Sequence, residues 1–96
     1  MTHSKTKTSF YRRLYVAHLI STGSDTVPQI TQLTGMPRRT AQDTIIALGE
    51  LAINCQFVGA KKDGRYKIND WGAINPQWVE VQLAHIIEVL GYPSSH

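Results

Sequence analysis

Residues 27–51 read VPQITQLTGMPRRTAQDTIIALGEL, and this stretch decides the fold. Apolar residues recur in it at helical spacing, first Ile30 and Leu33, then Ala41, Ile45, Leu48 and, just beyond the stretch, Ala52. Between the two sets, Gly35 suits the left-handed conformation that ends a helix, and Pro37 suits the opening of the next one. The stretch therefore predicts two short helices, at about 27–34 and 38–51, joined by a tight turn.

The start of the first of these helices is marked by Thr26-Val27-Pro28-Gln29. A Thr hydroxyl at this position can accept from the backbone N–H of Gln29, while the Gln side chain reaches back to the N–H of the cap residue. Pro28 falls in the first turn, where a missing N–H costs little. We therefore expect a capping box, which stabilises the helix and has no function of its own.

The run ITQLTGMPRRTAQDTIIALGEL resembles the helix-turn-helix of winged-helix bacterial transcription regulators, in which a Gly-apolar-Ser/Pro joint precedes an Arg/Thr-rich recognition helix. The resemblance continues into GAKKDGRYKI, which is similar to the β-hairpin wing of these proteins. The DWG stretch and the C-terminal helix resemble small, uncharacterised bacterial winged-helix proteins. The resemblance implies a mostly helical α+β winged helix-turn-helix at residues 9–74, with a three-helix core, a two-stranded wing and an extra C-terminal helix.

The resemblance also implies a DNA-binding protein, a bacterial transcription regulator whose second helix enters the major groove of double-stranded DNA. If Ala41, Ile45 and Leu48 point inward, the opposite face of this helix is free to contact bases. Arg suits guanine, Gln suits adenine, and an apolar side chain suits the thymine methyl group. The residues expected to read bases are Arg38, Arg39, Gln42, Asp43 and Ile46, with Thr40 expected on the phosphate backbone.

Asp43 departs from the pattern of these regulators, because a carboxylate near phosphates is unfavourable. It can accept from a cytosine amino group, or brace Arg39 four residues earlier. The mixed charge of this face leaves open a second function, a protein-interaction module that uses the winged-helix fold without DNA.

A strand pair is expected after the recognition helix. Residues 53–58 alternate, with Ile53, Cys55 and Phe57 on one face, and residues 65–69 pair with them through a hairpin at 59–64. Cys55 is interpreted as a small core residue. The basic residues of the hairpin either contact the DNA backbone or minor groove, or keep a sheet edge soluble: Lys61, Lys62, Arg65 and Lys67.

Residues 9–21 predict a first helix, capped by Thr8 or Ser9, with Phe10, Leu14 and Ala17 on its buried face. Residues 1–8 are expected to be a flexible basic arm. Arg12 and Arg13 lie on the exposed side of this helix. They either contact the DNA backbone, as in winged helices, or are solvated.

Residues 75–91 predict a C-terminal helix capped by Asn75, and residues 92–96 a tail. Apolar residues cover nearly half of this helix, which is more than one face of a small domain needs. Either the rest of the chain covers them, or they form a homodimer interface, for which the expected residues are Trp78, Val81, Gln82, His85 and Val89.

The composition excludes several classes of protein. A chain of 96 residues with one cysteine has no intrachain disulfide, and no metal-ligand spacing or phosphate-binding loop is present. We therefore expect no enzyme, no cofactor and no metal, and no small-molecule ligand is evident from the sequence. The start of the chain lacks the apolar segment of a secretory signal, and no apolar run is long enough to span a membrane, so a cytoplasmic location is expected.

The charges are distributed unevenly along the chain. All ten Lys and Arg lie in residues 1–67, together with four of the seven Asp and Glu, and residues 68–96 hold the other three acids. This split favours contact with phosphates at one end of the molecule only.

Overall fold

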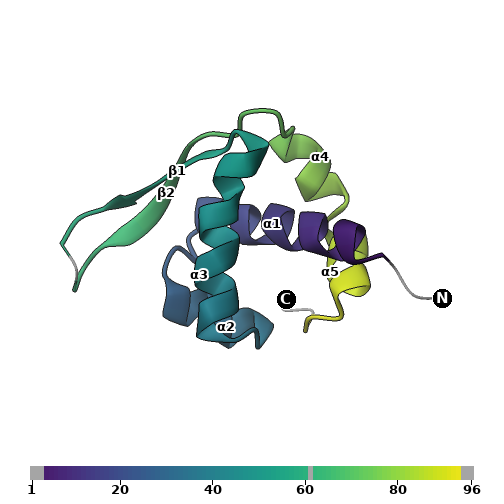
Figure 1. Cartoon of the computed structure of the whole chain (residues 1–96), viewed down its shortest axis with the longest axis horizontal. Coiled ribbons are helices and arrows are strands. Elements are labelled where there is room, and N and C mark those ends of the chain that lie inside the picture. Colours follow the sequence, from purple (N-terminus) through teal and green to yellow (C-terminus); the bar gives the residue numbers. More distant parts are fainter. Residues whose placement is uncertain (1–3, 61, 94–96) are drawn as a thin grey trace.

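The computed structural model describes residues 4–60 and 62–93. In chain order the elements are α1 (Lys5–Ser21), α2 (Val27–Thr34), α3 (Arg38–Ala47), the 3-10 helix η1 (Leu48–Leu51), β1 (Asn54–Val58), β2 (Arg65–Asp70), α4 (Pro76–Val81) and α5 (Leu83–Leu90). Figure 1 shows α2, α3 and a β-hairpin on one side of the molecule, α4 and α5 on the other, and α1 running between them. This arrangement confirms the predicted winged-helix fold class.

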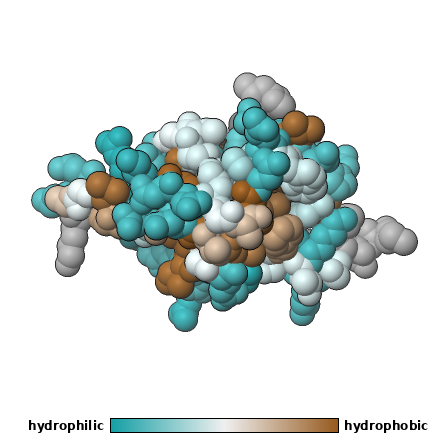
Figure 2. Space-filling view, turned by 90° about the horizontal axis from the view of Figure 1, so that it is seen from above, coloured by the Kyte–Doolittle hydropathy of each residue, from teal (hydrophilic) through white to brown (hydrophobic). Residues whose placement is uncertain are grey.

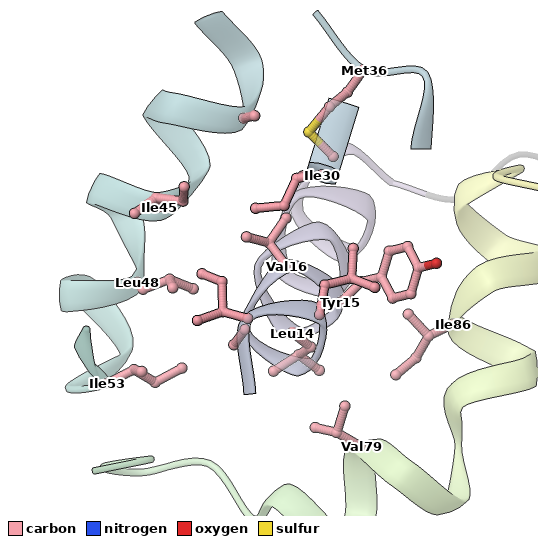
Figure 3. Packing of buried hydrophobic residues seen from close by; sticks show 14 of the residues in the cluster. Leu14, Tyr15, Val16, Ile30, Met36, Ile45, Leu48, Ile53, Val79 and Ile86 are labelled. Carbon is pink, nitrogen blue, oxygen red and sulfur yellow. The ribbon is translucent and has the colours of Figure 1, made fainter. Parts of the chain in front are cut away.

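Helix α1 lies at the centre of the fold, between α3 on one side and α5 on the other (Figures 1 and 3). Because both sides are covered, Leu14, Tyr15, Val16 and Ala17 are all buried although they follow one another in sequence. The apolar pattern predicted one buried face for this helix and missed Tyr15. The core is a single cluster that runs from Ile45 and Leu48 through α1 to Val79 and Ile86.

Helix α1 begins earlier than predicted. Ser4 is its cap, and the Ser4 hydroxyl accepts from the backbone N–H of Lys7 at 3.1 Å. Capping by Thr8 or Ser9 is therefore wrong, and so is the flexible arm for residues 5–8; residues 1–3 lie outside the described residues. Residues 5–8 are polar and add nothing to the apolar stripe of the helix. The apolar periodicity therefore did not predict that the helix includes them.

The turn between α2 and α3 is built as predicted. Gly35 adopts the left-handed conformation, with φ of 78°, and its N–H donates to the carbonyl of Thr31. The Thr34 hydroxyl, which is buried, donates to the carbonyl of Ile30 at 2.7 Å and accepts from the N–H of Met36 at 3.1 Å. Met36 is buried and its side chain points toward Ile30 (Figure 3), so the turn is fixed from both its polar and its apolar side.

The capping box of α2 is half as predicted. The Thr26 hydroxyl accepts from the N–H of Gln29 at 3.3 Å. The Gln29 side chain, however, accepts from the N–H of Asp25, one residue before the cap, at 3.1 Å. Both partners still satisfy a free backbone donor at the start of the helix.

Helix α3 is shorter than predicted, because its last turn tightens into η1. The chain then reverses at Ala52, which has a positive φ of 61° and is exposed rather than part of the buried stripe. Gly72, which also has a positive φ, packs so closely on Ala52 that a Cβ at Gly72 would overlap the Ala52 carbonyl. The Ala52–Gly72 contact closes the base of the hairpin.

Strands β1 and β2 are antiparallel, with Phe57 opposite Tyr66 and Val58 opposite Arg65. The Phe57 and Tyr66 rings meet edge to face, 5.1 Å apart, but Phe57 remains 49% exposed because it lies near the tip. Phe57 thus shares a face with Cys55, as predicted, but near the tip this face is open to solvent. The Tyr66 N–H donates to the Asp25 carbonyl at 2.8 Å, which ties β2 to the loop between α1 and α2.

The predicted C-terminal helix is two helices, α4 and α5, with a bend at Gln82. Asn75 caps α4 as predicted, accepting from Gln77 and Trp78. The bend turns both pieces onto α1, where Val79 and Ile86 are completely buried. Tyr92 does not belong to a free tail, because its ring stacks on Tyr15 at 5.8 Å. Within the described ranges no helix has the length and apolarity to cross a membrane.

Candidate nucleic-acid interface

One face of α3 is free of contacts with the core. The side chains of Ala41, Thr44 and Ile45 are buried, so helical geometry turns the opposite residues outward. All five residues predicted to read bases are exposed, including the apolar Ile46 at 77%: Arg38, Arg39, Gln42, Asp43 and Ile46. An isoleucine exposed to this extent contributes nothing to the core.

The N-terminus of α3 adjoins this face. Pro37 is the cap residue and offers no side-chain hydrogen bond, so no side chain occupies the free N–H groups of the first turn. Thr40, predicted on the phosphate backbone, is half-buried in this turn, and its carbonyl accepts from the Thr44 hydroxyl at 2.7 Å. The start of the helix thus combines two arginines with the positive end of the helix dipole.

Asp43 and Arg39 form an ion pair across one helical turn. Arg39 Nε lies 3.9 Å from Asp43 Oδ2, which agrees with the predicted bracing. The Arg39 side chain is 91% exposed, so the pair is loose and open to solvent. Such pairs restrain a side chain only weakly.

The hairpin, from β1 through β2, is hereafter called the wing. Arg65 and Lys67 are exposed on its outer face, because Tyr66 and Ile68 alternate with them toward the core. Lys62 is exposed in the turn, and Lys61 lies outside the described residues. Figure 2 shows the wing projecting from the body, with hydrophilic side chains interspersed with hydrophobic ones.

Val58 is a wing residue that the sequence analysis missed. It lies opposite Arg65 and is 47% exposed. The alternation that placed Phe57 inward places Val58 outward, so the signal was present in the sequence. Gly64 is also required here, since a Cβ would overlap the Phe57 ring.

Arg12 and Arg13 point to different parts of the fold. Arg12 Nε donates to the Tyr92 hydroxyl at 3.4 Å, on the side of α1 that carries α5. Arg13 forms an ion pair with Glu50 of η1 at 3.3 Å. Both side chains therefore have partners within the chain, and contact of these two arginines with the DNA backbone stays a prediction.

The groups with a shifted pKa lie away from the exposed face of α3. Burial raises the pKa of Tyr15 and lowers that of His18, both on α1. Burial also raises the pKa of the Cys55 thiol, which favours its unreactive protonated form. The described residues contain no group of three or more His, Cys, Asp or Glu able to hold a metal ion.

The residues predicted at a dimer interface fall on α4, α5 and the bend between them. Trp78 is 44% and Val81 79% exposed, both on α4. His85 is exposed but meets the Tyr11 ring edge to face, with 6.0 Å between centroids. Gln82 and Val89 are half-buried. The apolar surface left open therefore lies on α4, because α1 covers much of α5.

Comparison with known proteins agrees with this architecture. The winged helix-turn-helix family matches residues 5–90. A crystal structure of a DUF2131 family protein from Shewanella amazonensis is similar over 95% of this chain and 91% of its own, with a TM-score of 0.88 and 34% identity. No curated protein matches significantly.

The family match begins at the first residue of α1 and ends at the last residue of α5. It includes the turn at Gly35, the exposed face of α3 and the wing. The chain belongs to the winged helix-turn-helix family.

Proposed function

We propose that this protein binds double-stranded DNA in a sequence-dependent way, as a non-enzymatic transcription regulator. Binding DNA is the general property of the family's fold. In this proposal α3 lies in the major groove, and the wing contacts the backbone or the minor groove. A role on DNA places the protein in the compartment that holds the DNA, the bacterial cytoplasm.

The observation that carries the proposal is the exposed face of α3. Two arginines, a glutamine and an isoleucine project from one helix face without serving the core, and all four side-chain types suit base edges. The two arginines of this face lie at the N-terminal end of the helix, the part that usually enters the groove. The cations of the wing lie on the same end of the molecule (Figure 1).

Arg39→Ala tests the base-reading role. Loss of a bidentate contact with guanine is expected to weaken binding to a selected DNA site by roughly 5- to 150-fold. Binding to random duplex is expected to fall much less, since Arg39 then loses only a general charge contact. Fluorescence anisotropy with sites selected from a random library gives both affinities.

Lys5→Ala is the matched control for Arg39→Ala. It removes one exposed cation at the start of α1, at the other end of the molecule (Figure 1). The control is expected to bind like the wild type. Equal effects of the two variants on both DNAs would contradict base reading by Arg39. If the wild type binds no duplex even at low salt but co-purifies with a stoichiometric protein partner, the protein-interaction function replaces the proposed one.

We further propose that the protein acts as a homodimer through α4 and α5, with two copies of α3 on a palindromic site. Among the residues that the structure describes, Val81 on α4 is the most exposed of the large apolar ones, which supports an interface there. Sedimentation of the wild type is then expected to give twice the 10.8 kDa mass of one chain. Val81→Glu is expected to give the mass of one chain.

The matched control for the dimer is Val58→Glu, which makes the same change on the wing. It is expected to leave the mass unchanged. A wild type that sediments as a single chain at concentrations where it binds DNA would contradict the homodimer.

A further inference from the structure

Asp43 occupies the middle of the base-reading face of α3. Arg39, Asp43 and Ile46 follow one another along one line of the helix, and all three are exposed. Seven residues of α-helix rise about 10 Å, which matches roughly three base pairs of DNA. A helix that places Arg39 and Ile46 on base edges therefore places the Asp43 carboxylate on a base edge between them.

The contacts of Asp43 within the protein do not account for a negative charge at this position. Its side chain is 69% exposed, and its ion-pair partner is Arg39 at 3.9 Å, a loose contact through Nε. The contact leaves the two terminal nitrogens of the guanidinium for a bidentate pair with guanine. Asp43 is also the only acidic residue in the sequence of α3, so the negative charge is confined to one point of the face.

A carboxylate is selective in the major groove because it can only accept hydrogen bonds. The guanine edge and thymine O4 present acceptors, which repel it, as do the phosphates. The donors in this groove are the amino groups of cytosine and adenine. Adenine N7, an acceptor beside its amino group, repels a carboxylate, so cytosine is the base that Asp43 fits best. Asp43 therefore lowers the affinity for most DNA sequences. It does not lower the affinity for sites that have a cytosine opposite its carboxylate. Specificity then comes from rejection of the wrong sequences.

We infer that Asp43 is a specificity-determining residue that weakens binding to DNA in general and makes recognition depend on a cytosine next to the guanine read by Arg39. The inference rests on the proposed function and deepens it. The two residues act in opposite ways on affinity. The Asp43 side chain lowers affinity for non-cognate DNA, whereas Arg39 raises affinity for the cognate site.

The test compares the wild type with Asp43→Asn, which keeps the shape and removes the charge. The Asp43→Asn variant is expected to bind random duplex at least about fivefold more tightly than the wild type does. Fluorescence anisotropy at 0.1 M salt measures both affinities. Sites selected by Asp43→Asn from a random library are expected to lose the cytosine preference at one position. Glu88→Gln, an exposed acid on α5, makes the same charge change away from α3 and is expected to alter neither result.

Other outcomes separate the inference from the proposed function. If the wild type binds duplex DNA but Asp43→Asn binds random duplex no more tightly, or selects the same sites, the inference fails and the proposed function stands. If Asp43→Asn loses affinity for every sequence as Arg39→Ala does, Asp43 is a positioning residue for Arg39 and the inference is wrong. If neither protein binds duplex at low salt, both fail. Thermal melting by circular dichroism checks that Asp43→Asn is folded.

Discussion

Gly72→Ala is expected to lower the free energy of unfolding by about 4 kcal/mol. The added Cβ would overlap the backbone carbonyl of Ala52, which cannot rotate away as a side chain would. Forcing an atom into packed structure costs about 1–3 kcal/mol, and the left-handed conformation of Gly72 adds about 1–2 kcal/mol for any residue with a Cβ. Urea unfolding followed by circular dichroism measures the loss.

Gly91→Ala is the control for backbone conformation alone. Gly91 ends α5 with φ of 74°, close to that of Gly72, but nothing lies within 4 Å of where its Cβ would be. The free energy of unfolding of Gly91→Ala is therefore expected to fall by only about 1 kcal/mol. Equal losses in the two variants would show that the Ala52–Gly72 contact is not the cause.

Removing the charge of the wing is expected to weaken DNA binding by on the order of a hundredfold at 0.1 M salt, taking about 1 kcal/mol for each lost contact. The variant replaces Lys62, Arg65 and Lys67 by Gln, and all three side chains are exposed. The plot of log affinity against log salt concentration is expected to become shallower by about 2.7, since each phosphate contact contributes about 0.9. Titrations at four or more salt concentrations give the slope.

Lys5→Gln combined with Lys7→Gln removes two cations from the start of α1, far from the wing in Figure 1. This double variant is expected to keep the slope of the wild type. A wing variant whose slope also stays unchanged would mean that the wing does not contact phosphates. Its lysines would then serve to keep the sheet edge soluble.

Local signals in the sequence predicted the elements whose boundaries depend on nearby residues. Thr26 and Gly35 bound α2 because a capping hydroxyl and a left-handed glycine act within a few residues. The break at Gln82 and the burial of Tyr15 depend on how α1, α4 and α5 pack, and no local signal encodes that packing. Ser4, Thr8 and Ser9 are all good capping residues, so choosing among them needed the structure.

Helical periodicity was enough to predict the part of the candidate interface that lies on α3. The spacing of Ala41 and Ile45 fixed the opposite face of α3, and all five residues expected there are exposed. The surroundings of Arg12 and Arg13 were not predictable, because Tyr92 and Glu50 are distant in the sequence. The exposure of Phe57 was not predictable, because the pattern of alternation does not show where a strand leaves the body of the protein.

The central position of α1 also constrains the order of folding. Every element that covers α1 follows it along the chain, from Ile30 in α2 to Ile86 in α5. During synthesis α1 therefore emerges with both apolar sides bare, and the side that packs on α5 stays bare until α5 has left the ribosome. The two ends of the domain are thus expected to form and to melt together, as one cooperative unit.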